Sequence, residues 1–179
     1  MKTLQLLTLT LFLNLTAFSN AQDASNDATW EETISFISEN LKYAVLESLE
    51  QKIRKEDLGK NYARISNKPK HSVQESFLKT HYSSKRMSDN STSNAYRETA
   101  LNKLKMVTIE EETNDNLTTY RVTLILTGDF SSIKINDYEE KFTDKAYIHF
   151  DDKTLAKRMT TAFQHLAYLS NEKRKQSKF

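Results

Sequence analysis

The fold is decided by residues 145–169, which read KAYIHFDDKTLAKRMTTAFQHLAYL. Apolar Ala146, Ile148 and Phe150 alternate with polar neighbours, as in a strand with one buried side. Asp151 or Asp152 can then cap a helix and complement its dipole. Beyond them, apolar residues recur at helical spacing, namely Leu155, Met159, Ala162, Phe163, Leu166 and Leu169. This stretch therefore predicts a strand followed by a helix that ends near Lys173.

A second helical pattern lies far upstream, behind the sequence Thr29-x-x-Glu32. This spacing is typical of a capping box, in which each of the two side chains bonds the backbone amide of the other residue. An apolar stripe follows at spacings of three and four, formed by Trp30, Ile34, Ile37, Leu41 and Val45. We expect a helix over 30–43 that continues over 44–57, with a possible kink between them and an end at Gly59.

Between the helices the pattern has a period of two, which predicts strands. The clearest strand covers 120–127, where one face would carry Tyr120, Val122, Leu124 and Leu126 and the other Arg121, Thr123, Ile125 and Thr127. With only two glycines in the chain, the turns must use Asn and Asp, which tolerate a positive φ. A polar loop is expected at 88–94, and the other expected strands cover 72–83, 96–100, 104–113, 131–135 and 145–150.

The order helix, strands, helix predicts an α+β fold. We expect a bent antiparallel sheet of about six strands, because short connections favour antiparallel pairing, with an N-terminal and a C-terminal helix packed on it. Residues 29–173 would form a single domain, after a flexible segment at 22–28 and before a basic tail at 174–179.

The stretch from about 72 to 173 resembles the pleckstrin-homology-like superfold, in which a C-terminal helix closes a bent antiparallel sheet. The resemblance lies in the strand 146–150, the aspartate cap and the helix 155–169 with His165-Leu166 near its middle. It implies a PH-like barrel. The last helix is also similar to that of small exported bacterial proteins of unassigned function. Trp30 lies in the first helix rather than the last, and no Lys/Arg-x-Arg pattern follows the first strand, so lipid headgroup binding is not implied.

Residues 1–21 have the features of a signal peptide. Met1-Lys2 precedes an apolar run from Leu4 to Leu15, and small residues at Ser19 and Ala21 suit cleavage before Gln22. The alternative is an uncleaved anchor, although the run is short for a membrane-spanning helix. We therefore expect an exported protein, periplasmic or secreted, with no transmembrane segment after cleavage.

Composition excludes several chemistries. The chain has no cysteine, which removes thiol catalysis and thiolate metal sites. With only Gly59 and Gly128, it has no glycine-rich phosphate loop, dinucleotide fingerprint or nucleophile elbow. The net charge of +2 is too small to indicate a nucleic acid partner. No cofactor is expected.

Charge is distributed in blocks along the chain. From Lys52 to Arg86 there are 10 basic and 3 acidic residues, whereas from Val107 to Asp152 there are 4 basic and 11 acidic residues. In one interpretation a basic surface binds an anionic ligand or a protein partner, and its residues are Lys60, Tyr62, Arg64, Lys68 and Lys70. In the other, the basic and acidic segments neutralise one another.

Candidates for catalysis and metal binding are few. His149 and Asp151, two apart at a strand end, could share a cation with His165, but a histidine beside a helix-capping aspartate explains both residues without a metal. We therefore predict neither a metal site nor catalytic residues. The sequence favours a non-catalytic binding or interaction module. The alternatives are a small hydrolase that uses scattered acidic and histidine residues, and a structural subunit of an envelope assembly.

Overall fold

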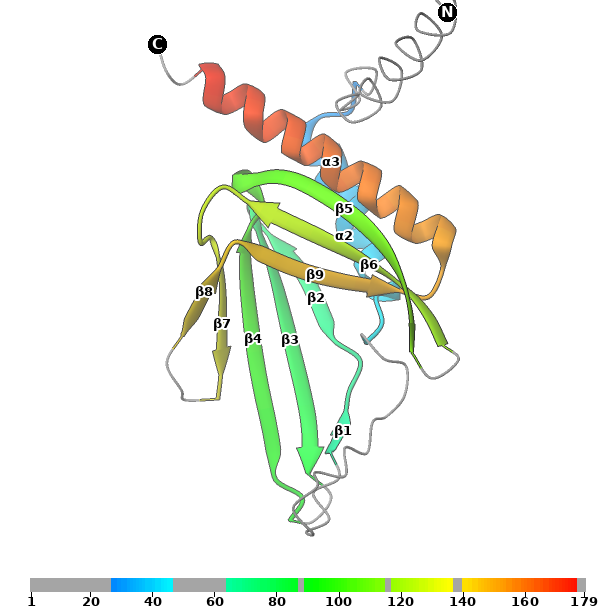
Figure 1. Cartoon of the computed structure of the whole chain (residues 1–179). Coiled ribbons are helices and arrows are strands. Elements are labelled where there is room, and N and C mark those ends of the chain that lie inside the picture. The colour runs from blue at the N-terminus through cyan, green and yellow to red at the C-terminus, as the bar shows by residue number, and fades with distance from the viewer. Residues whose placement is uncertain (1–26, 47–63, 87–88, 115–116, 137–139, 177–179) are drawn as a thin grey trace, which may run out of the picture.

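The computed structural model describes residues 27–46, 64–86, 89–114, 117–136 and 140–176, which form two helices and two antiparallel sheets (Figure 1). The α+β class, the antiparallel pairing and the two terminal helices are confirmed. The predicted signal peptide and Gly59 lie outside the described residues.

The first helix, α2, covers Trp30–Asn40 and begins with the predicted capping box. The Thr29 hydroxyl accepts the Glu32 amide at 3.2 Å, and the Glu32 carboxylate accepts the Thr29 amide at 2.8 Å. A 3-10 turn, η1, follows over Leu41–Tyr43. The predicted continuation of the helix is wrong over 44–46, because the Val45 amide donates instead to the His149 carbonyl at 2.8 Å. The rest of 44–57 lies outside the described residues.

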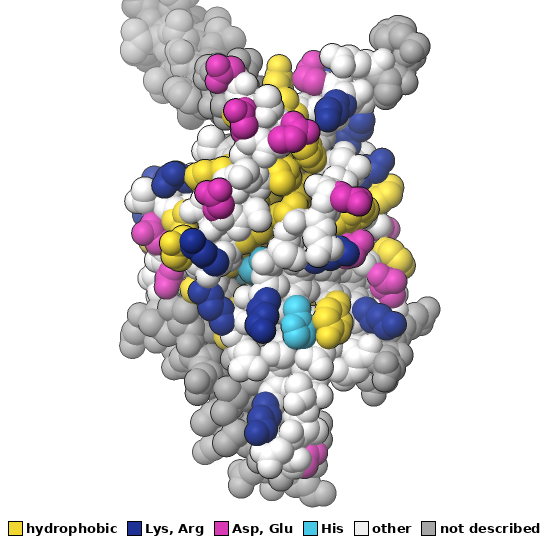
Figure 2. Space-filling model, turned by 180° about the vertical axis from the view of Figure 1, so that it is seen from behind, with side chains coloured by type: hydrophobic (Ala, Val, Ile, Leu, Met, Phe, Trp, Pro, Cys, Tyr) yellow, Lys and Arg dark blue, Asp and Glu magenta, His cyan; other side chains and the backbone are white. Residues whose placement is uncertain are grey.

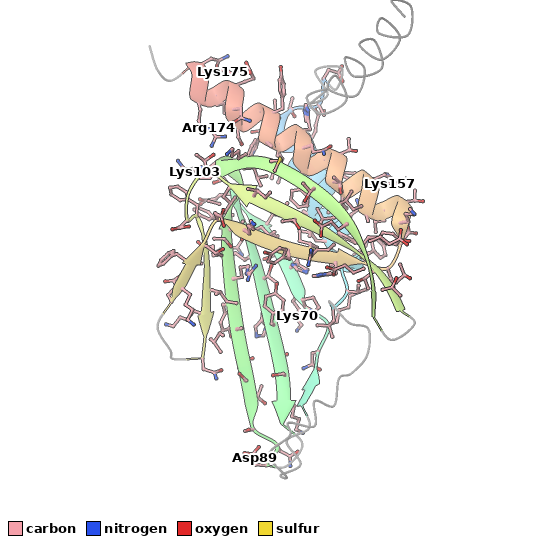
Figure 3. The ribbon with its side chains drawn as sticks, viewed as in Figure 1. Lys70, Asp89, Lys103, Lys157, Arg174 and Lys175 are labelled. Carbon is pink, nitrogen blue, oxygen red and sulfur yellow. The ribbon has the colours of Figure 1, made fainter. Side chains whose placement is uncertain are left out.

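The second helix, α3, covers Lys153–Gln176 and is capped by Asp152, whose carboxylate accepts the Leu155 amide at 2.7 Å. It extends slightly past the predicted end, into the residues expected to form the basic tail. Arg174 stabilises this last turn, since its guanidinium donates to the Leu104 carbonyl at 2.8 Å. Figure 3 shows Arg174 beside Lys103 at this end of the molecule.

The strands form two sheets rather than one, so the predicted single sheet of about six strands is wrong. One sheet has the order β5-β6-β9, with β5 at Leu104–Asn114, β6 at Leu117–Leu126 and β9 at Lys145–Phe150. The other has the order β1-β3-β4-β7-β8, and β2 also pairs with β3. Its strands are β1 Arg64–Ser66, β2 Lys70–Gln74, β3 Phe77–Arg86, β4 Thr92–Ala100, β7 Ser131–Ile135 and β8 Lys141–Thr143. A second 3-10 turn, η2, at Leu101–Lys103 joins β4 to β5. The described residues form no closed barrel.

The predictions for the two ends of β3 differ from the structure. The predicted strand over 72–83 is the hairpin of β2 and β3, which turns at Glu75 with a φ of 55°. Glutamate rarely adopts a positive φ, so the sequence gives no sign of a turn there. The predicted polar loop over 88–94 is shorter, because β4 already begins at Thr92. As expected, asparagine supplies other turns, with φ of 56° at Asn90 and 50° at Asn136.

The core lies between the three-stranded sheet and the two helices. Alternate residues of β6 and β9 form one wall, and the other wall comes from Ile37 of α2 and the apolar stripe of α3. The opposite face of this sheet carries Arg121, Tyr147 and His149, which line a cavity together with residues of the larger sheet. None of the described helices has the length and apolar character needed to span a membrane.

Candidate functional site

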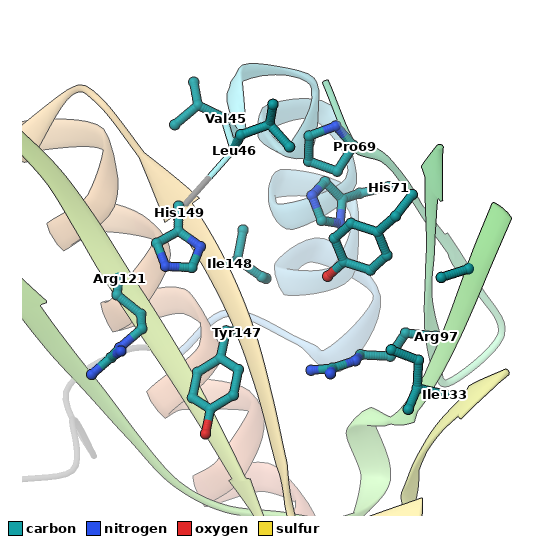
Figure 4. A pocket seen from close by; sticks show the side chains of 12 residues that line it. Val45, Leu46, Pro69, His71, Arg97, Arg121, Ile133, Tyr147, Ile148 and His149 are labelled. Atoms are coloured by element: carbon teal, nitrogen blue, oxygen red, sulfur yellow. The ribbon is translucent and has the colours of Figure 1, made fainter. Parts of the chain in front are cut away.

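A cavity of about 490 Å³ lies between the two sheets (Figure 4). This volume falls in the range of roughly 300–1,000 Å³ that small-molecule sites occupy. Its apolar wall is formed by Val45, Leu46, Pro69, Ala95, Ile133 and Ile148. Its polar and aromatic groups are those of His71, Tyr82, Arg97, Arg121, Tyr147 and His149.

The strand register explains how these side chains meet. His71 of β2, Thr80 of β3, Arg97 of β4 and Ile133 of β7 are successive cross-strand partners, so they form one row on the inner face of the larger sheet. On the three-stranded sheet, Arg121 of β6 is the cross-strand partner of His149 of β9. Tyr147 lies two residues before His149 and therefore shares its face. The cavity is thus built by side chains from both sheets.

Arg121 is neutralised by two carboxylates of β5. Its guanidinium forms salt bridges with Glu110 and, at 2.5 Å, with Glu112. Burial lowers the pKa of Arg121, but the hydrogen bond that Arg121 donates to Glu110 and the negative charges of Glu112 and Glu110 outweigh that effect and raise the pKa. Glu112 also lies 3.5 Å from Nε2 of His149. Arg121, Glu110, Glu112 and His149 thus contact one another at one side of the cavity.

Arg97 lies in a different electrostatic environment. Among the described residues, no carboxylate is within salt-bridge distance of its guanidinium. Its Nε atom is buried and has no hydrogen-bond partner in the part of the chain that the structure describes. Figure 4 shows the side chain extending from β4 toward Tyr147, and the guanidinium lies 5.9 Å from the centre of that ring. Arg121 lies 5.5 Å from the same ring. Arg97 therefore brings a positive charge to the cavity that nearby carboxylates do not offset.

His71 presents a second unpartnered polar atom. Its Nδ1 lies 2.9 Å from the Thr80 hydroxyl, whereas its Nε2 is buried and has no hydrogen-bond partner. Burial, followed by the positive charges of Lys68 and His149, lowers the pKa of His71 to about 4. His71 is therefore neutral at pH 7. When the Thr80 hydroxyl donates to Nδ1, the remaining ring proton is on Nε2, and a ligand can accept it.

Of the predicted basic surface, the described side chains of Lys68 and Lys70 do not line this cavity. Lys60 and Tyr62 lie outside the described residues, and the Arg64 backbone belongs to β1. Lys68 donates to the Lys42 carbonyl at 2.8 Å. Lys70 is on the outer face of the larger sheet, in a shallow groove of about 540 Å³.

The outer groove contains an exposed row of side chains across four strands. The register aligns Lys70, His81, Tyr96 and Lys134. The rings of His81 and Tyr96 stack at 4.6 Å between centroids. On this face, Figure 2 shows a histidine and a hydrophobic side chain lying side by side between basic side chains. Glu98 and Glu140 also line the groove, and Glu98 pairs with Lys79 at 3.4 Å. Of the predicted basic residues, Lys70 thus belongs to a surface of mixed charge.

The three weak metal candidates are separated. His149 faces the cavity on one side of the three-stranded sheet, and Asp151 is exposed after β9. His165 is buried in α3, on the other side of that sheet, where its Nε2 donates to the Ala28 carbonyl at 2.7 Å. The described residues hold no group of three or more His, Asp or Glu side chains that could bind a metal ion.

No protein-family model matches this chain, and neither a curated protein nor a solved structure matches it. The fold therefore defines the protein only as an α+β protein of two antiparallel sheets and two helices. Since a fold alone does not determine function, the functional argument depends on the chemistry of the cavity.

Proposed function

We propose that this protein is an exported, non-catalytic binding module whose ligand is a small molecule held between the two sheets. The observation that carries the proposal is the Arg97 guanidinium, a cation that has no carboxylate partner among the described residues and lies in a cavity of ligand size. A partly buried charge and unpartnered polar atoms are costly unless something compensates them. A bound ligand would supply that compensation. The proposal does not depend on the resemblance to the pleckstrin-homology-like superfold, which stays a prediction.

The lining of the cavity supports binding. Small-molecule sites are mostly apolar, with a few polar groups that orient the ligand. Here the aliphatic side chains of Val45, Leu46 and Ile133 accompany two arginines and two histidines. The strands carry most of these residues, so their positions are fixed before a ligand arrives.

The proposal can be tested with N-phenyl-1-naphthylamine, a neutral dye whose fluorescence rises in apolar surroundings. We expect one dye molecule to bind per protein molecule. Ala95→Phe, which adds a ring inside the cavity, should weaken dye binding at least tenfold. Glu98→Phe adds the same ring on the exposed side of the same strand and serves as the matched control. Equal dye binding by the two variants would contradict the proposal.

A small hydrolase is the first alternative, and the contact between His149 and Glu112 is the observation that favours it. A hydrolase also needs a nucleophile or an activated water within reach of such a pair. The described residues that line the cavity include no serine, threonine or carboxylate. Glu112 is also held by Arg121. The lining therefore supports binding better than hydrolysis.

A structural subunit of an envelope assembly is the second alternative. The strand β8 ends the order of the larger sheet, and Phe142 on this strand is 63% exposed. An uncovered strand edge beside an aromatic side chain can pair with another chain. Light scattering at increasing protein concentration tests this role. A structural subunit should form an assembly of higher mass, and Phe142→Ser should weaken that assembly.

A further inference from the structure

We infer that the ligand of this cavity is a small monocarboxylate with an apolar body, and that Arg97 binds its carboxylate. The inference rests on the proposed function, because it assigns a chemical class to the molecule in the same cavity.

The charges of the cavity set the charge of the ligand. The Arg121 guanidinium is held by the carboxylates of Glu110 and Glu112, and Glu112 also lies 3.5 Å from Nε2 of His149. The imidazole of His71 is neutral at pH 7. Arg97 is the cavity arginine with no carboxylate within salt-bridge distance among the described residues. The single positive charge of this guanidinium suits a monoanion better than a doubly charged phosphate ester.

The donors near this charge suit the geometry of a carboxylate. A guanidinium presents a planar fork of N–H groups that can bond both carboxylate oxygens. Nε of Arg97 and Nε2 of His71 are both buried and unpartnered. Thr80 lies between these two residues in the cross-strand row and bonds the other ring nitrogen of His71, which fixes the orientation of the imidazole.

The apolar residues locate the body of the ligand. Ile133 is the cross-strand neighbour of Arg97, and Val45 and Leu46 complete the aliphatic wall. A ligand with its carboxylate at Arg97 can therefore place an aliphatic or aromatic body against these side chains. A small polar anion such as acetate would leave this wall uncovered and lose the gain from apolar burial.

Three probes with eight carbons each test the inference: octanoate, octanamide and octyl phosphate, each below its micelle concentration. Calorimetry gives their affinities, and amide chemical shifts report whether they bind in the cavity. Charge-assisted hydrogen bonds are stronger than neutral ones. We expect octanoate to bind about 10-fold to 100-fold more tightly than octanamide, and octyl phosphate to bind no more tightly than octanoate.

Two variants locate the carboxylate. Arg97→Gln should remove the preference for octanoate and leave octanamide affinity unchanged. Lys134→Gln, which removes a positive charge from the outer face of the same sheet, is the control and should retain the preference. If Arg97→Gln does not fold, Arg97→Lys replaces it. A loss of octanoate affinity of at least threefold in Arg97→Lys, with octanamide unchanged, supports the inference, and an unchanged octanoate affinity overturns it.

The outcomes separate this inference from the proposed function. Equal binding of octanoate and octanamide in the cavity would overturn the carboxylate assignment and leave the binding function intact. Tighter binding of octyl phosphate, or a preference that Arg97→Gln retains, would also overturn it. If no probe shifts the cavity amides and the neutral dye does not bind either, the proposed function itself fails.

Discussion

His71 should make the stability of the folded protein depend on pH. Its pKa is lowered from an ordinary value of 6.5 to about 4, chiefly by burial. Between these two values the unfolded chain binds a proton that the folded protein does not. The contribution of His71 to the free energy of unfolding should therefore be fully present above pH 6.5, decrease as the pH drops and level off below about pH 4.

The size of the effect follows from the two pKa values. A difference of one unit corresponds to about 1.4 kcal/mol, so the interval from 6.5 to about 4 corresponds to about 3 kcal/mol. Other groups also titrate in this range, and a comparison with His71→Gln removes their contribution.

The assay is urea unfolding of wild type and His71→Gln at pH 7.5 and pH 4. We expect the wild type to lose about 3 kcal/mol more than His71→Gln between these conditions. His81→Gln removes a histidine from the outer face of the neighbouring strand and controls for the loss of one titrating ring. Parallel pH profiles for wild type and His71→Gln would refute the reasoning.

The other predictions concern packing, processing and metal. Leu124 is fully buried in β6, so Leu124→Ala should lower the free energy of unfolding, measured in urea, by about 2–5 kcal/mol. An unchanged urea midpoint would mean that the inward face of β6 is assigned wrongly. Mass spectrometry of the protein from its native host should find Gln22, give or take two residues, at the mature N-terminus, and recovery of intact Met1 from membranes would contradict export. The melting temperature should be the same in chelator and in micromolar zinc, and a rise of several degrees that His149→Ala abolishes would reverse the prediction of no metal site.

Much of the secondary structure could be predicted because its signals are local. The capping box at Thr29 and Glu32, the aspartate cap of α3 and the alternation in β6 each involve residues close in the chain. The turn at Glu75 could not be predicted, because its positive φ occurs at a residue without turn preference. The extended backbone at Val45 was also missed, since only its pairing with His149, far along the chain, reveals it.

The cavity could not be predicted because its groups come from several strands of two sheets. In the sequence, His71, Arg97 and Arg121 are ordinary polar residues of alternating segments, and only the meeting of the sheets makes them neighbours. One signal was present. Tyr147 and His149 place two rings on the side of β9 opposite the core, and that side was expected to face solvent. Two rings at alternate positions indicate that a second surface packs against it.

A crystal structure of the mature protein with octanoate tests the central claim most directly. The account predicts density for one octanoate in the cavity between the two sheets. Its carboxylate should lie within hydrogen-bond distance of the Arg97 guanidinium, and its tail should contact Ile133 and Val45. Octanoate bound only elsewhere, with Arg97 making no contact to it, would contradict the account.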